Sequence, residues 1–150
     1  MKSVDKFFLT VLVCAFLAAP VYAQSAGVRV GVSGDPSQFY FGGHYETAPF
    51  VEQLRFRPNL EIGVGDNHTL TAVNFEFAYF VPLQRRNPWS VYFGAGPALV
   101  IDHVTNNTTT GGGFNILVGA QHEHGFFTEV KVGAIDSPSF KFGVGYTFRP

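Results

Sequence analysis

The chain has 150 residues, a length typical of one domain, and a net charge of −1, which gives no basic surface for nucleic acid. Charged residues make up only 14% of the sequence and aromatic residues 16%, with 17 phenylalanines and 17 glycines. This composition excludes an intrinsically disordered chain, which lacks aromatic residues, and it argues against a helical protein, because glycine is unfavourable within helices.

The first 23 residues have the pattern of a cleavable secretory signal peptide. Lys2 and Lys6 precede an apolar run at residues 7–19, and a Val-Tyr-Ala sequence suited to cleavage follows. The run is shorter than the roughly 20 apolar residues of a transmembrane helix. We therefore predict a cleaved signal peptide at residues 1–23 and one domain at residues 24–150. Cys14, the sole cysteine, lies in the signal, so the exported domain has no disulfide.

After residue 24, apolar and polar residues alternate with the two-residue period of β-strands. The clearest run has apolar residues at the even positions from 54 to 64 and polar residues or glycine between them. Segments rich in Gly, Asp, Asn and Pro, typical of turns, separate eight such runs. In chain order, the predicted strands are residues 28–32, 38–45, 54–64, 72–81, 89–101, 114–121, 127–134 and 140–148. Since short connections join antiparallel neighbours, the predicted fold class is all-β, an eight-stranded antiparallel up-and-down barrel.

The glycines indicate which face of the predicted sheet points inward. Nine of them lie on the polar faces: Gly31, Gly42, Gly63, Gly94, Gly96, Gly119, Gly133, Gly143 and Gly145. Glycine weakens a strand, so this concentration on one face, with Gly43 as the main exception, indicates steric crowding there. The interior of an eight-stranded barrel is just wide enough for side chains, and an arginine or glutamate crossing it needs a small residue opposite. We therefore predict a polar, side-chain-filled lumen and an apolar exterior facing lipid, as in a transmembrane barrel.

Charged side chains on the polar faces form the candidate site, a structural network in the lumen. They carry both signs: Arg29, Arg55, Arg57, Glu61, Glu76, Glu129, Lys131 and Lys141. Buried charges need partners, so mixed signs favour a closed network; a proton or ion path is the alternative. If residues 65–68 form a simple hairpin, Arg57 lies opposite Glu76, close enough for a charge-assisted hydrogen bond.

The combined features resemble the OmpA/OmpX-type small outer-membrane β-barrels. The resemblance rests on the signal peptide, the eight alternating segments, the polar lumen, Gly-Ala-Gly-Pro at residues 94–97 and the aromatic last strand at residues 140–148. It implies the outer membrane of a Gram-negative bacterium, contact with outer-membrane lipid and lipopolysaccharide, and recognition of the last strand by the assembly machinery. We expect a monomer without a cofactor, not an enzyme and not a wide pore, with a structural or surface-interaction role.

Two alternatives stay open, and neither has a strong motif. An outer-membrane enzyme that modifies lipid A, by deacylation or acyl transfer, would need a nucleophile. Only Ser33 and Ser90 lie on polar strand faces, and no His-x-Ser motif occurs. The other alternative is a soluble periplasmic barrel that binds an apolar ligand. No metal site is predicted, because His122 and His124 have no third ligand nearby in the sequence.

Two local expectations concern loops and prolines. With both termini in the periplasm, residues 34–37, 65–68, 102–113 and 136–139 would face outward. The longest of these segments, residues 102–113, is predicted to be a mobile loop. Pro58 and Pro97 fall within strands and lack the N–H group that a ladder uses, so we expect β-bulges or a barrel rim there.

Overall fold

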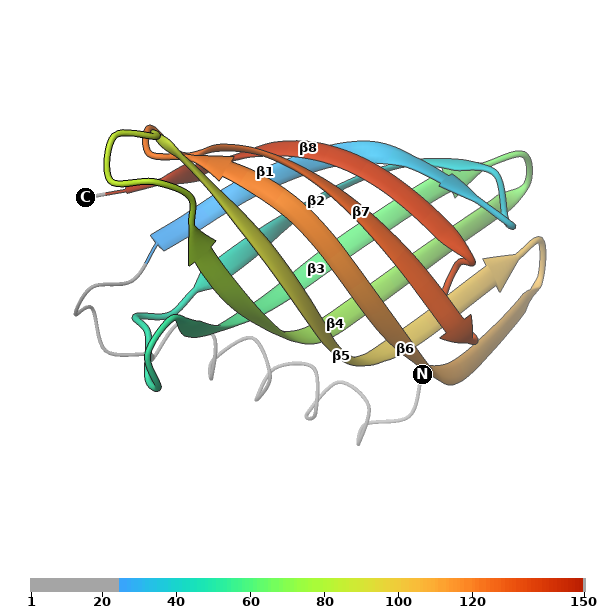
Figure 1. The fold of residues 1–150 in the computed structure, drawn as a ribbon. Helices are drawn as coiled ribbons and strands as arrows, with labels where there is room; N and C mark the ends of the chain where they lie inside the picture. The colour runs from blue at the N-terminus through green and yellow to red at the C-terminus, as the bar shows by residue number, and fades with distance from the viewer. Residues whose placement is uncertain (1–24, 150) are drawn as a thin grey trace.

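The computed structural model describes residues 25–149, which form a closed antiparallel barrel (Figure 1). The eight strands are β1 (Ser25–Gly34), β2 (Gln38–Glu46), β3 (Leu54–Gly65), β4 (His68–Pro82), β5 (Trp89–Val104), β6 (Asn107–His122), β7 (Phe126–Ile135) and β8 (Phe140–Phe148). The predicted signal peptide lies outside the described residues. Within them, no helix is long and apolar enough to cross a membrane.

Each strand pairs with its neighbour in the chain, and β1 pairs with β8 to close the barrel. Four tight turns join the strands at one end. The other end has the start of β1, the end of β8 and the longer connections at residues 47–53 and 83–88 (Figure 1). We call these the turn end and the terminal end. The predicted eight-stranded up-and-down topology is confirmed.

The barrel has a polar interior and an apolar exterior. Outward-facing side chains are large, apolar and about half exposed, as at Phe39 (54%), Ile116 (61%) and Val132 (55%). Most of the inward-facing charged side chains are almost completely buried, including Arg57 and Glu76, whose exposed fraction is 0%. A soluble barrel has the opposite distribution, because water favours charge outside and apolar groups within.

Four of the inward-facing glycines lie against aromatic rings. A Cβ atom added at Gly31 or Gly143 would collide with the ring or hydroxyl of Tyr40, and one at Gly145 would collide with the Phe127 ring. From the sequence, charged side chains were expected to lie over these glycines. Instead, buried aromatic rings occupy the space, and the glycines allow large rings to fit inside a narrow barrel.

Gly119 provides a test of this steric role. A side chain there would collide with the Tyr92 ring, so we expect Gly119→Val to lower the free energy of unfolding by at least about 1–3 kcal/mol, the usual range for overpacking. Gly112→Val is the matched control on the same strand, because a Cβ atom at Gly112 meets nothing within 4 Å. Urea unfolding of the refolded variants measures both effects, and equal stability would contradict the steric argument.

The expected proline bulges are absent. The β3–β4 register continues through Pro58↔Phe75 without an offset, and the β5–β6 register continues through Pro97↔Phe114. Each proline instead interrupts the pairing of its strand with the other neighbouring strand. The β2–β3 pairing ends at Asn59, and the β4–β5 pairing omits Pro97 but resumes in the same register. A missing N–H group is therefore accommodated by a local gap in one ladder, without an extra residue.

The prediction of a long mobile loop at residues 102–113 is wrong. β5 extends to Val104 and β6 begins at Asn107, so only two residues form the turn. Cross-strand pairing holds this hairpin together, including a 2.7 Å hydrogen bond between His103 Nδ1 and Thr108 Oγ1. The polar composition suggested a loop, but threonine favours strands, and main-chain pairing does not require apolar side chains.

Candidate functional site: the charged interior

Glu129 on β7 is the centre of the buried network. Its carboxylate accepts hydrogen bonds from Arg29 Nη1 at 3.0 Å, Arg57 Nη1 at 3.2 Å and the Tyr92 hydroxyl at 2.8 Å. The Lys131 ammonium lies 3.5 Å from the same carboxylate. These partners come from β1, β3, β5 and β7, so a single carboxylate connects strands on different sides of the barrel.

A second group of charges lies around Lys131. Its ammonium donates to Glu76 at 2.7 Å and to Glu61 at 2.9 Å. Glu61 also accepts hydrogen bonds from Lys141 at 2.6 Å and from Arg29 at 3.2 Å. Arg29 thus joins both groups into one continuous network. Seven of the eight predicted residues are buried in it, and Arg55 lies at its edge with its side chain 24% exposed.

The structure pairs Arg57 and Glu76 in register, as the hairpin argument predicted. The direct hydrogen bond between them was the wrong prediction. Arg57 binds Glu129 and approaches Glu46, whereas Glu76 binds Lys131 and accepts a hydrogen bond from Asn59 at 2.7 Å. Long side chains reach across the lumen, so facing positions on adjacent strands need not be bonding partners.

Glu46 is a network residue that sequence reasoning missed. It is 1% exposed, forms an ion pair with Arg55 and lies 3.4 Å from Arg57 Nε. The signal was present in the alternation, because Glu46 has the same parity as Tyr40, Gly42 and His44 on the polar face of its own strand. The predicted strand ended one residue too early, at Tyr45. With Glu46, the interior contains five cations and four carboxylates, which is close to charge balance.

Amides and aromatic rings complete the interior. Asn115 donates to Asn74, and Asn74 donates to Asn59, each at 2.7 Å, which links β6, β4 and β3. Toward the terminal end, the Arg57 guanidinium lies 4.7 Å from the centre of the Tyr92 ring and 5.3 Å from that of Phe127. Such cation–π contacts stabilise a cation where water is excluded. The polar-face alternation indicated these residues, although only charged residues were named as candidates.

This arrangement is suited to holding the barrel together. Arg29, Arg57, Tyr92, Phe127 and Lys131 are among the largest fully buried side chains, so the middle of the lumen is filled. Among residues 25–149, no group of three His, Cys, Asp or Glu side chains could hold a metal ion. His44 binds Thr147 at 3.0 Å inside the barrel, and the His68 ring contacts the Asp102 carboxylate. In that described range, no serine hydroxyl bonds a histidine, so no serine nucleophile is activated in this way.

Comparisons with known proteins place this fold among small outer-membrane barrels. No family model and no curated protein matches the sequence. Among solved structures, Neisserial surface protein A is 12% identical with a TM-score of 0.65, covering 85% of this chain and 96% of its own. The N-terminal β-barrel domain of Pseudomonas aeruginosa OprF is 13% identical with a TM-score of 0.59, covering 84% and 97%. The outer-membrane enzyme PagL is 11% identical with a TM-score of 0.54, covering 85% and 100%.

These similarities establish the class of fold, the small eight-stranded barrel that was predicted as an OmpA/OmpX-type resemblance. The chain covers nearly all of each matched structure, so the shared unit is the whole barrel. One of the three is an enzyme, so the fold by itself does not determine activity.

Proposed function

We propose that this protein is an integral outer-membrane protein with a structural or surface-binding role, and that its barrel crosses the bilayer without forming a wide pore. The observation that carries the proposal is the inverted polarity of the barrel, with charge buried inside and half-exposed apolar side chains outside. A closed barrel pairs its main-chain groups between strands and leaves no free edge in the hydrocarbon region, so it can cross a bilayer.

The same observation argues against the soluble alternative. A barrel that binds an apolar ligand needs an apolar cavity, but here buried ions and amides occupy the middle of the lumen. The lipid A-modifying alternative has the PagL fold similarity in its favour. It lacks a bonded histidine–serine pair in the part of the chain that the structure describes.

Cell fractionation tests the membrane proposal. We expect the protein in the outer-membrane fraction, extracted by detergent and retained after osmotic shock, because its exterior would be unstable in water. A periplasmic binding protein of known solubility is the control for complete release. Release of the folded barrel by osmotic shock, without detergent, would contradict the proposal.

A conductance measurement tests whether the lumen is closed. In planar bilayers we expect the refolded protein to give no large, steady conductance steps, because buried ion pairs and aromatic rings fill the middle of the lumen. A porin reconstituted in the same bilayers is the positive control. Stable steps of porin size would show that the interior opens, and they would favour the ion-path alternative over a structural network.

A further inference from the structure

β6 extends beyond β7 at the turn end of the barrel (Figure 1). The β6–β7 ladder begins at Gly113↔Ile135, whereas β6 begins at Asn107. Residues 107–112 pair with β5 on one side and with no described strand on the other. An edge strand with unpaired main-chain groups can accept another strand, and this segment (Asn-Thr-Thr-Thr-Gly-Gly) has no charge or proline to block pairing.

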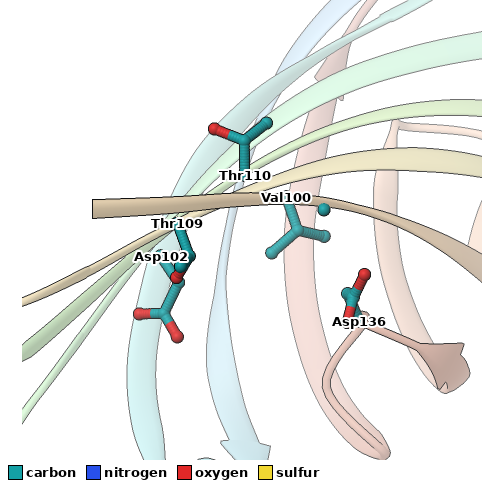
Figure 2. Close-up of a pocket in the computed structure, with 6 residues that line it drawn as sticks. Val100, Asp102, Thr109, Thr110 and Asp136 are labelled. Atoms are coloured by element: carbon teal, nitrogen blue, oxygen red, sulfur yellow. The ribbon is translucent and has the colours of Figure 1, made fainter. Parts of the chain in front are cut away.

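A cavity of about 400 Å³ lies beside this free edge. It is lined by Val100, Asp102, Thr109, Thr110, Gly111 and Asp136. Figure 2 shows Asp136, on the turn between β7 and β8, across the opening from Asp102 and Thr109, with Val100 between them. The cavity lies beside the contact between β6 and the turn that follows β7, because a Cβ atom added at Gly111 would meet the Asp136 carboxylate. Its volume lies within the usual range of ligand pockets.

The charge around the cavity is negative. Asp102 and Asp136 line it, and Asp35 and Asp66 lie in the other turns at the same end. The four segments between strands at this end contain no lysine or arginine. Among residues 25–149, His68 is the one basic side chain in contact with a lining carboxylate, that of Asp102. A ligand complementary to this surface is cationic.

A buried hydroxyl next to the cavity has no partner. Ser137, which follows Asp136, is 8% exposed, and its Oγ has no hydrogen-bond partner. A Cβ atom added at Gly113 would collide with this hydroxyl, so Ser137 lies against β6, two residues from the lining residue Gly111. An unpaired buried hydroxyl is unfavourable, and this one lies next in the chain to the lining residue Asp136 without itself lining the cavity.

From the free edge, the cavity and the charge, we propose that residues 107–112 bind an extended cationic peptide segment of a partner protein as an added β-strand. Alternate lysine or arginine side chains of that segment enter the cavity between Asp102 and Asp136, while main-chain bonds form with β6. The cavity is far larger than a metal ion needs, and the free edge matches an extended chain. This inference rests on the proposed surface role and identifies the partner's chemistry.

Peptide binding to the refolded barrel in a non-ionic detergent tests this proposal. The probe is a fluorescent six-residue peptide of alternating lysine and valine, and fluorescence anisotropy at physiological ionic strength measures its Kd. We expect saturable binding that weakens at least tenfold in the double variant Asp102→Asn/Asp136→Asn. The matched control, Asp35→Asn/Asp66→Asn, removes the same charge at the same end and should change Kd less than twofold. A shift in electrophoretic mobility on heating confirms that each variant is folded.

Main-chain pairing is tested with the peptide alone. In an added strand, alternate N–H groups face β6, so N-methylation of one alternate set should abolish binding and methylation of the other set should not. A peptide with glutamate in place of lysine should not bind. Equal binding by both methylated peptides, equal loss in both double variants, or binding of Ca²⁺ without binding of the peptide would each overturn the proposal. Dimerisation through this edge in analytical ultracentrifugation would also overturn it.

These outcomes are independent of the proposed membrane location. If the barrel fractionates with the outer membrane but binds no peptide, the proposed function stands and only the proposed partner is contradicted. If osmotic shock releases the barrel, the proposed function is contradicted, whatever the result of the peptide experiment.

Discussion

Replacing Glu129 with alanine should be among the most destabilising single changes in this barrel. The substitution removes the acceptor for Arg29, Arg57 and Tyr92 and leaves the guanidinium groups buried with fewer counter-charges. Removing one partner of a buried ion pair usually lowers stability by about 3–5 kcal/mol, because the remaining charge stays desolvated. Urea unfolding in lipid vesicles, followed by the fluorescence of Trp89, the sole tryptophan, measures the change.

Two further variants separate charge from packing at this position. Glu129→Gln keeps the size of the side chain and one acceptor oxygen but removes the charge. It should therefore lower the free energy of unfolding, by less than the alanine variant does. Glu123→Ala removes a carboxylate from an exposed turn residue and should change stability by less than about 0.5 kcal/mol. If the Glu129 and Glu123 alanine variants unfold at the same urea concentration, Glu129 does not hold the network together.

Lys131 and Glu76 should be strongly coupled in a double-mutant cycle, and Arg57 and Glu76 should not. The Lys131 ammonium lies 2.7 Å from a Glu76 oxygen, whereas Arg57 faces Glu76 in the ladder but binds other carboxylates. Neighbours in one network typically have interaction energies of about 0.5–3 kcal/mol. We expect a value in the upper part of that range for Lys131→Met with Glu76→Gln.

The matched cycle uses Arg57→Met with Glu76→Gln. It has the same carboxylate and the same kind of cation removal, but without a direct contact, so its interaction energy should be clearly smaller than that of the Lys131–Glu76 pair. Because Lys131→Met leaves Glu76 and Glu61 short of a cation, adding Glu76→Gln should recover part of the stability that the single change removes. A larger coupling for the Arg57 pair would show that ladder position decides the partner.

The sequence by itself determined the number and order of the strands and the direction of their side chains. Apolar and polar residues alternate with a period of two when a segment is extended and its two faces lie in different environments. Residues Leu54 to Val64 could therefore be assigned to a β-strand from the sequence. The tight turn at residues 66–67 also set the register, and Arg57 faces Glu76 as a result. The glycines on the polar face indicated a crowded interior, which local sequence can show because glycine weakens an ordinary strand.

Only the tertiary structure decided which charges pair. Alternation places Glu129 on the inner face, but its partners Arg29 and Arg57 are distant in sequence and reach it across the closed barrel. The length of β6 beyond β7, and therefore the free edge and the cavity at Asp136, was also decided by tertiary structure, because a polar threonine-rich segment can be either loop or strand. The local alternation of apolar and polar residues indicates the environment on each face of a strand. Partners across the lumen depend on how the sheet closes, which no local pattern contains.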